Sequence, residues 1–362
     1  INRDELAQLA CALTDIPSPT GQEKAVADHI LAWFRANGLK AIAQEVEIGR
    51  PNAVGVLKGT GGGLSLGFNG HTDTSYTGTV EDLRMIAEVE PESELRGVIV
   101  GDKVIIATSN GVDWSHLNIP APLAPALVIV DKNTGKVLAE EVAGVSKRAL
   151  HASWGSAAFA DVKGVPTIVW GGGDGLCYGF DLNPFQHPEG FPALKEFFRY
   201  DANPPEYRTK NGQPLKYATH DGPSEIIATV IVHEGRAYMV IGQDPEHGDG
   251  VGMVSCLDLT ARGDITGKAV WTNKSIGRSI STPSLHEGLL YQAEYNGNIH
   301  CIDITNGKIL WTYATNSRIW SSTLVADGKV YCGTEDGELI ILRTGREMKL
   351  VGKPEFFSPI YA

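Results

Sequence analysis

One short stretch of this sequence has the residue types and spacing of a metal ligand and its orienting group. His71 and Asp73 lie two residues apart, just after an apolar run at 64–68. Alternation along a strand puts two such side chains on one face. A carboxylate behind a ligating imidazole fixes the tautomer of the ring, so the pattern is consistent with His71 as a metal ligand oriented by Asp73. The same pair is also compatible with a structural role in a strand-to-loop turn.

A second candidate site is a glycine-rich loop at 242–252, which carries acidic side chains and an imidazole. The residues concerned are Asp244, Glu246, His247 and Asp249. Oxygen-rich loops of this kind suit a hard cation such as calcium. The spacing departs from the usual calcium-loop pattern, which favours a solvated acidic loop over a cation site.

The elements that lead up to the histidine indicate the start of an α/β unit. Apolar residues at helical spacing predict helices over 4–13 and 20–37. Thr20 and Glu23 form the capping-box pair expected at the start of the second helix. Strands are expected over 41–47, 53–58 and 64–68. Two helices followed by three strands are typical of the beginning of an α/β domain.

Residues 1–95 resemble the zinc metallopeptidase family of acetylornithine deacetylase and succinyl-diaminopimelate desuccinylase. The resemblance rests on the run Ile16-Pro-Ser-Pro-Thr-Gly-Gln-Glu23 and on Gly70-His71-Thr-Asp73-Thr74. It implies that His71 binds zinc and that Asp73 orients the imidazole.

The family also requires a bridging aspartate, a Glu-Glu pair, a further carboxylate and a distal histidine, and no such series follows residue 95. Glu140 and Glu141 imitate the Glu-Glu pair, but they follow a repeat motif of another kind. A catalytic zinc needs three protein ligands and an open position. The segment is therefore expected to be a truncated α/β piece without activity.

The stretch from 281 to 342 contains one pattern twice, at an offset of 40 residues. Residues 281–291 correspond to 321–331, and Asn296-Gly297 corresponds to Asp336-Gly337. Such turn pairs between short apolar runs predict tight hairpins, which need positive φ. A period of about 40 residues with four short strands predicts the blades of a β-propeller.

Five partial copies of this repeat follow residue 96, a sixth begins at 357, and a proline-rich insertion at 184–223 interrupts them. The motif Asp-x-x-x-Gly-Lys-x-x-Trp at 303–311 resembles the repeats of pyrroloquinoline-quinone-like, or quinoprotein-type, propellers. Trp271 and Trp311 are expected to pack on the neighbouring blade. The predicted fold is mainly β: an incomplete propeller of about five to six four-stranded blades over 96–362, preceded by the small α/β segment.

Composition and charge exclude several classes of partner. The 362 residues carry a formal net charge of −12, which argues against nucleic acid or an anionic membrane surface as the main partner. No apolar run approaches the length of a membrane span. Five scattered cysteines, without a paired motif, are expected to be buried small side chains. The propeller resemblance implies a periplasmic or other extracytoplasmic location, and the N-terminal resemblance a cytoplasmic one.

The sequence favours a non-catalytic binding or scaffold propeller that carries an incomplete metallopeptidase-like segment. Its expected ligand is an unidentified protein or small molecule on the propeller face. One alternative is a zinc-dependent amide hydrolase that uses His71. The other is a quinone-dependent dehydrogenase, which would need pyrroloquinoline quinone and calcium. Trp114, Trp154 and Trp320 could stack on such a cofactor, but each lies near the start of a strand, which favours packing between blades.

Overall fold

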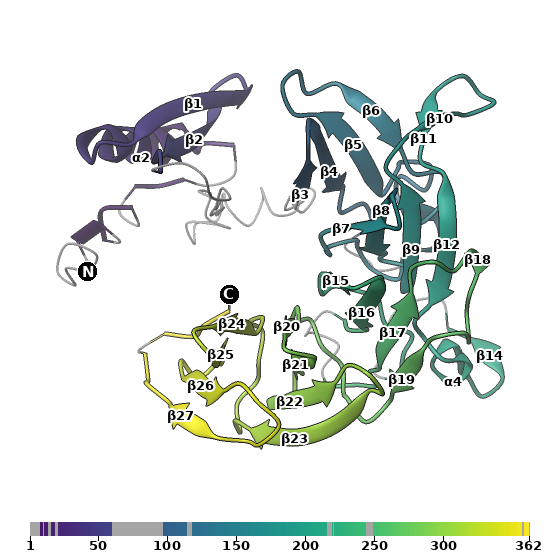
Figure 1. Ribbon diagram of the computed structural model, residues 1–362. Coiled ribbons are helices and arrows are strands. Elements are labelled where there is room, and N and C mark those ends of the chain that lie inside the picture. Colours follow the sequence, from purple (N-terminus) through teal and green to yellow (C-terminus); the bar gives the residue numbers. More distant parts are fainter. Residues whose placement is uncertain are drawn as a thin grey trace. The chain divides into compact units, whose positions relative to one another are not determined.

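The computed structural model divides the chain into two compact units, Ile1–Pro91 and Glu92–Ala362 (Figure 1). The residues that it describes are 8–9, 11–13, 16–18, 21–59, 97–113, 118–215, 219, 221–243, 249–356 and 358–361. Strands dominate and helices are few, which confirms the mainly β class. Within these residues, no helix is long and apolar enough to cross a membrane.

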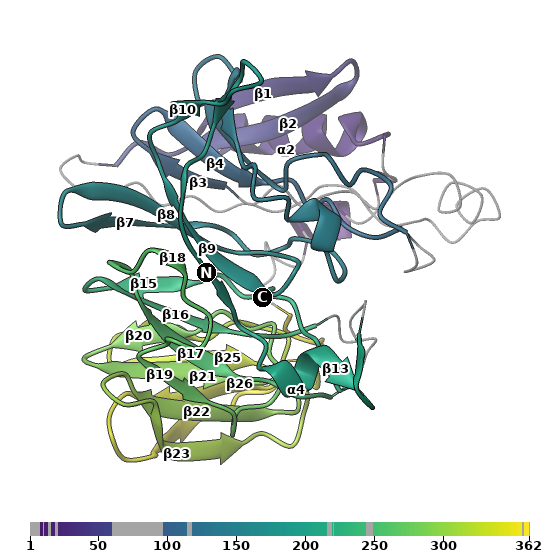
Figure 2. The same ribbon diagram turned by 90° about the vertical axis from the view of Figure 1, so that its right-hand side faces the viewer.

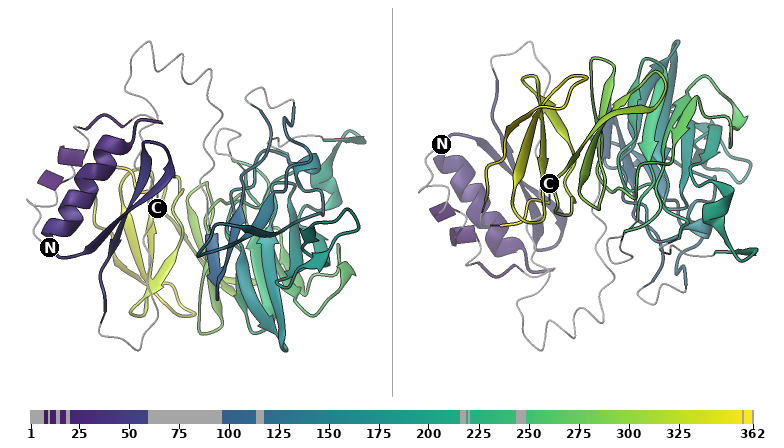
Figure 3. Two further views of the ribbon diagram at one scale, coloured as in Figure 1. Left: turned by 90° about the horizontal axis from the view of Figure 1, so that it is seen from above. Right: turned by 90° about the horizontal axis from the view of Figure 1, so that it is seen from below.

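The first unit contains a helix and a hairpin. The helix α2 (Lys24–Ala36) lies along the antiparallel strands β1 (Lys40–Glu47) and β2 (Arg50–Val56), as Figure 3 shows. Gly55 permits this close approach, because a Cβ there would lie 2.9 Å from the ring of Phe34. Arg50 also pairs with Glu23, at 2.6 Å between Nη2 and Oε1, which ties the hairpin to the start of the helix. The predicted third strand lies outside the described residues.

The second unit contains five successive sheets, numbered here one to five. Sheet one holds β3 (Gly97–Val100), β4 (Lys103–Ala107), β5 (Leu127–Asp131) and β6 (Val137–Glu140). Sheet two holds β7 (Ala158–Val162), β8 (Val165–Gly171), β9 (Leu176–Asp181) and β12 (Glu196–Asp201). Sheet three holds β15 (Ile231–His233), β16 (Arg236–Val240), β17 (Val254–Asp258) and β19 (Trp271–Asn273). Sheet four holds β20 (Ser284–His286), β21 (Leu289–Ala293), β22 (Asn298–Asp303) and β23 (Lys308–Ala314). Sheet five holds β24 (Leu324–Ala326), β25 (Lys329–Gly333), β26 (Leu339–Arg343) and β27 (Leu350–Gly352).

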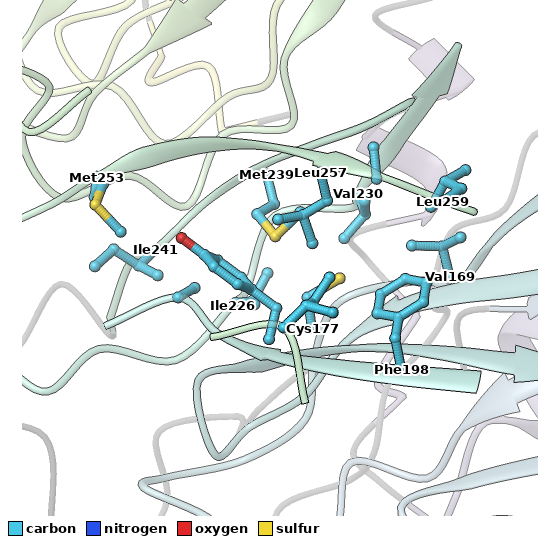
Figure 4. Packing of buried hydrophobic residues seen from close by; sticks show 14 of the residues in the cluster. Val169, Cys177, Phe198, Ile226, Val230, Met239, Ile241, Met253, Leu257 and Leu259 are labelled. Carbon is cyan, nitrogen blue, oxygen red and sulfur yellow. The ribbon is translucent and has the colours of Figure 1, made fainter. Parts of the chain in front are cut away.

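Each sheet packs face to face on the next, and this stacking confirms the partial propeller. Four buried clusters join sheets one and two, two and three, three and four, and four and five. Figure 2 shows the strands of sheets three and four in successive layers. Figure 4 shows the cluster between sheets two and three, where Phe198 and Cys177 meet Met239 and Leu257. The five stacked sheets are therefore blades of a propeller.

The 40-residue repeat is confirmed in the strand register. Ser284 pairs with Tyr291 in blade four, and Leu324 pairs with Tyr331 at the same place in blade five. Gly297 and Gly337 both have positive φ, at 101° and 84°, as tight hairpin turns require.

A row of large side chains in each of blades three and four faces the next blade. In blade three the row is Tyr238, Cys256 and Trp271, and in blade four it is Tyr291, Cys301 and Trp311. We call it the interblade row. The indole Nε1 of Trp271 donates a hydrogen bond to the Ile304 carbonyl at 2.8 Å, and that of Trp311 donates to the Gly345 carbonyl at 2.9 Å. Both tryptophans thus pack on the following blade, as predicted.

The proline-rich stretch at 184–223, expected as an insertion between blades, contributes strands to two of them. It supplies β12, the fourth strand of blade two, and β10 (Phe185–Gln186) and β11 (Pro192–Ala193), which extend blade one. Alternating burial at Phe198 and Tyr200 is the local signal for β12. The described residues of this stretch also include α4 (Pro205–Arg208) and a short hairpin of β13 (Thr209–Lys210) and β14 (Gln213–Pro214).

Shortening Trp311 tests the contact between blades four and five. Trp311→Ala removes a buried ring and its hydrogen bond, so we expect a loss of about 3–5 kcal/mol in the free energy of unfolding. Trp311→Phe keeps most of the apolar contact and should cost about 1–2 kcal/mol. Urea denaturation followed by circular dichroism measures both. Equal losses of unfolding free energy for the two variants would contradict the packing and hydrogen bonding assigned to the Trp311 indole.

Asp303 fixes the turn after β22 and gives blade four a dependence on pH. Its Oδ1 accepts hydrogen bonds from the Thr305 hydroxyl and amide, at 2.6 and 3.0 Å, and its Oδ2 lies 2.6 Å from Arg346 Nη2. These bonds lower the pKa of the Asp303 carboxyl to about 2. Because the folded pKa lies below the unfolded one, the stabilisation is present at neutral pH and is lost as the pH falls from about 4 to 2.

Asp303→Asn is therefore expected to destabilise the protein by about 1–2 kcal/mol at pH 7, after allowance for the exposure of Arg346. The difference in unfolding free energy between Asp303→Asn and the wild type should become smaller as the pH falls from about 4 towards 2. Urea midpoints at several pH values measure it. Asp327→Asn is the matched control: the Lys329 ion pair lowers the pKa of the Asp327 carboxyl too, but this side chain is 90% exposed, so solvent screening should make its pH-dependent difference smaller.

Candidate functional site

The sequence-predicted site residues fall mainly outside the described part of the chain. His71 and Asp73 lie outside it, as do Asp244, Glu246 and His247, whereas Asp249 is described. Among the described residues, no group of three or more His, Cys, Asp and Glu side chains could hold a metal ion. Zinc at His71 and a cation at the 242–252 loop therefore stay predictions.

Asp249 has a cationic neighbour inside the protein. Arg278 is buried, and its Nη2 donates to the Thr219 carbonyl at 2.7 Å. Burial lowers the pKa of Arg278 to about 10, while the charges of Glu225 and Asp249 oppose that shift. Asp249 is the one described residue of the four that were predicted as a cation site in this loop. It interacts electrostatically with the guanidinium of Arg278.

The buried cysteines are poorly suited to nucleophilic chemistry. Cys177, Cys256, Cys301 and Cys332 lie on strands and are buried, as the sequence predicted, whereas Cys11 is exposed. Burial raises the pKa of Cys301 to about 12 and that of both Cys256 and Cys332 to about 11. A thiol with so high a pKa holds little thiolate near pH 7.

A hollow of about 470 Å³ on blade two brings together three arginines that the sequence analysis did not single out. It is lined by Arg148, Asp174, Leu176, Arg199, Asp201, Arg208, Asp264 and Thr266. Blade two and its added strand β18 (Gly263–Asp264) supply most of this lining. Arg148 ends the short 3-10 helix η1 (Ser146–Arg148), and Arg208 ends α4.

Arg148 and Asp174 of the lining form a hydrogen-bonded network with Tyr178, which is buried beside the hollow. Arg148 Nη2 lies 3.0 Å from Asp174 Oδ2 and donates to the Tyr178 hydroxyl oxygen at 2.7 Å. The Tyr178 hydroxyl donates to Asp174 Oδ2 at 2.6 Å. Burial raises the pKa of the Asp174 carboxyl, and the Tyr178 hydrogen bond and the Arg148 charge oppose this. Burial and the neighbouring Asp174 also raise the pKa of Tyr178, so its hydroxyl keeps its proton as a donor.

Each of the other two arginines forms a bidentate ion pair with a carboxylate. Arg208 bonds to Asp201 through Nε and Nη2, at 3.0 and 2.7 Å. Arg199 bonds to Glu196 through Nε and Nη2, both at 2.7 Å. Within the described residues, these bonds leave Nη1 of Arg199 and of Arg208 available to a ligand. The lining thus carries three arginines and three aspartates, and an anion would meet only the guanidinium nitrogens that these pairs leave unoccupied, with the direction of each guanidinium already set.

These residues come together only in the folded chain. Arg148 and Arg208 lie 60 positions apart, and neither belongs to a repeat motif. The only local signal is the alternation of residues 196–201, which predicts a strand with Arg199 and Asp201 on one face.

The chain is similar to known proteins over part of its length. Residues 251–347 match the family described as outer membrane protein assembly factor BamB. The chain is 34% identical to the beta-alanine-activating enzyme of Drosophila melanogaster over 26% of its own length, and the match spans 11% of that protein.

Two solved structures are similar to the chain over about three quarters of its length. BamB from Moraxella catarrhalis has a TM-score of 0.48 and 14% identity, over 73% of this chain and 64% of that chain. The computationally designed Ika8 protein has a TM-score of 0.37 and 12% identity, over 75% of this chain and 78% of that chain.

The family match falls on blades three to five, and together with the five stacked sheets it supports a quinoprotein-like propeller. It lies wholly within the second unit. The metallopeptidase resemblance of residues 1–95 receives no support from it.

Removing the Tyr178 hydroxyl tests the hydrogen-bonded network beside the hollow. Tyr178→Phe deprives a buried carboxylate of a donor, so we expect a loss of about 1–3 kcal/mol in the free energy of unfolding. Tyr200→Phe is the matched control, because its hydroxyl lies 3.2 Å from the neutral Ser255 hydroxyl. Urea denaturation should show the larger loss for Tyr178→Phe, and the reverse order would contradict the proposed contact network.

Proposed function

We propose that the second unit is a non-catalytic binding propeller whose arginine-lined hollow receives carboxylate side chains of a protein partner. The observation that carries this proposal is the set of Arg148, Arg199 and Arg208 around one hollow of about 470 Å³. Glu196 and Asp201 occupy the paired edges of Arg199 and Arg208, so a ligand carboxylate would accept single charge-assisted hydrogen bonds from the Nη1 groups. The ligand is thus defined by its chemistry, as an acidic segment.

The rigidity of the arginines supports this proposal. Arg199 and Asp201 project from β12, in the interior of a five-stranded sheet, and Asp201 holds Arg208. Side chains that are already ordered lose less conformational entropy when a ligand binds. A carboxylate that enters the hollow therefore meets donors that need little rearrangement.

The charge of the whole chain limits the kind of partner. At a net charge of −12, long-range attraction does not bring an acidic segment to the protein. Recognition must come from short-range contacts with the arginines, which favours a partner held at several points. The matched family is named for a protein assembly factor, and a role as a docking platform for another protein is our extension of that name to this chain.

The two enzymatic alternatives rest on other residues. A zinc-dependent amide hydrolase would depend on His71 and Asp73, and a quinone-dependent dehydrogenase on a calcium site such as the 242–252 loop. Because most of these side chains lie outside the described residues, both alternatives stay predictions from the sequence.

A labelled acidic peptide tests the proposed function. We expect fluorescein-labelled tetraglutamate to bind the protein, with Arg199→Ala weakening the affinity about 5- to 20-fold through the loss of one charged hydrogen-bonding group. Fluorescence anisotropy measures the dissociation constant. The net charge of −12 attracts a tetralysine peptide non-specifically, so the discriminating result is that Arg199→Ala should not weaken its binding.

Arg236→Ala is the matched control for this experiment. The Arg236 side chain is 37% exposed and pairs with Asp258, much as Arg199 is 36% exposed and pairs with Glu196, but Arg236 does not line the hollow. Its substitution should leave peptide affinity unchanged. The proposal fails if both variants lose affinity equally or if tetraglutamate does not bind to the wild type.

A further inference from the structure

Glu141, from the Glu-Glu pair at 140–141, is a buried carboxylate that the proposed function does not use. It follows β6 directly and is 4% exposed. Its Oε1 accepts a hydrogen bond from the Ala126 amide at 3.1 Å, and its Oε2 accepts from the amides of Ala143 and Gly144, at 2.7 and 3.2 Å. This side chain therefore joins the residue before β5 to the loop that leaves blade one.

The loop that Glu141 holds also holds Arg148, one of the three arginines that line the hollow. The Ala143 carbonyl accepts a hydrogen bond from Arg148 Nη1 at 3.0 Å. The turn of η1 starts from the same loop, because the Lys147 amide donates to the Gly144 carbonyl at 3.3 Å. Ala143 thus donates to Glu141 from its amide and accepts from Arg148 at its carbonyl, so one residue connects the buried carboxylate to the guanidinium.

These contacts leave the Arg148 guanidinium with one direction for a ligand. A guanidinium has five N–H groups. The Nε and Nη2 of Arg148 donate to Asp174 at 3.2 and 3.0 Å, and Nη2 also donates to Tyr178 at 2.7 Å. Together with the bond to Ala143, these are four contacts, so within the described residues one N–H group, on Nη1, remains. Because Ala143 takes the other hydrogen of Nη1, its position decides where the remaining one points.

We propose that Glu141 is a positioning residue for the hollow, which directs the remaining N–H of Arg148 by holding the loop at 142–144. The inference rests on the proposed function, since it concerns the same acidic ligand. Glu141 does not line the hollow, so it acts through the main chain and not by touching the ligand.

A purely electrostatic role of Glu141 predicts the opposite effect on binding. Burial raises the pKa of the Glu141 carboxyl, the three amide hydrogen bonds oppose this, and the charge of Asp174 adds to it. The carboxylate thus interacts through space with a residue of the hollow, and its negative charge repels an anion there. Removing the charge would strengthen anion binding if Glu141 acted by charge alone, whereas it would weaken binding if Glu141 positions Arg148.

The affinity of Glu141→Gln for an acidic peptide separates these roles. The substitution keeps the size of the side chain and replaces one acceptor oxygen with a donor. We expect the full chain with this change to bind fluorescein-labelled tetraglutamate about 3- to 10-fold more weakly, by fluorescence anisotropy. Glu294→Gln is the matched control and should leave the affinity unchanged, because Glu294 is 3% exposed and accepts the Gly277 amide but lies in blade four.

A double-mutant cycle distinguishes positioning from a general loss of structure. If Glu141 acts through Arg148, Glu141→Gln should weaken peptide binding no further in a protein that already carries Arg148→Ala. In a protein that carries Arg208→Ala, the full loss of affinity should remain. Glu141→Asp keeps the charge but is too short to reach all three amides, so it should also weaken binding and serves as the second variant.

The side-chain NMR signal of Arg148 tests the contact without a peptide. In protein labelled with ¹⁵N-arginine, the Nε–H signals of Arg148 and Arg208 are identified by their loss in Arg148→Lys and Arg208→Lys. Glu141→Gln should shift the Arg148 signal and leave the Arg208 signal in place. If the shift appears but tetraglutamate does not bind to the wild type, the proposed function fails and the positioning of Arg148 stands.

Three outcomes would overturn this inference. They are unchanged or tighter peptide binding by Glu141→Gln, an equal loss of affinity with and without Arg148→Ala, and an Arg148 signal that does not shift.

Discussion

The second unit depends on one requirement, that each blade cover an apolar face of its neighbour. A four-stranded sheet with apolar side chains on both faces cannot be stable alone in water, because only stacking removes both faces from solvent. The interblade row meets this requirement in blades three and four with a tyrosine, a cysteine and a tryptophan. The indole hydrogen bond to a carbonyl of the following blade then fixes the position of each contact.

The same requirement explains which parts of the fold the sequence predicts well. The strands and turns of blades four and five follow from local signals, since each hairpin closes over a few residues and its glycine turn is visible in the chain. The stretch at 184–223 is harder to read, because β11 and β12 find their partners far along the sequence. Nothing in the residues near Pro192 indicates a pairing with β6.

The candidate site was predictable to a smaller extent, and for a similar reason. Arg148, Arg199 and Arg208 share no motif, and their proximity is a result of tertiary structure. The residues that the sequence did single out, His71 and the acidic loop at 242–252, were recognised because their spacing is local. Such motifs show which chemistry is available, whereas the hollow depends on the pairing of β9, β12 and β18 and on the positions of η1 and α4, which together bring its arginines to one surface.

Two short added strands have a consequence for how the second unit comes apart. After blade two has begun, β11 returns to pair with β6 of blade one, and β18, from the loop before β19 of blade three, pairs with β12 of blade two. Backbone hydrogen bonds therefore connect the first three blades to one another, in addition to the side-chain contacts between them. Blades four and five are each complete four-stranded sheets without a borrowed strand. Under mechanical load or partial denaturation, blades one to three would unfold together as one cooperative unit. Blades four and five would each unfold separately.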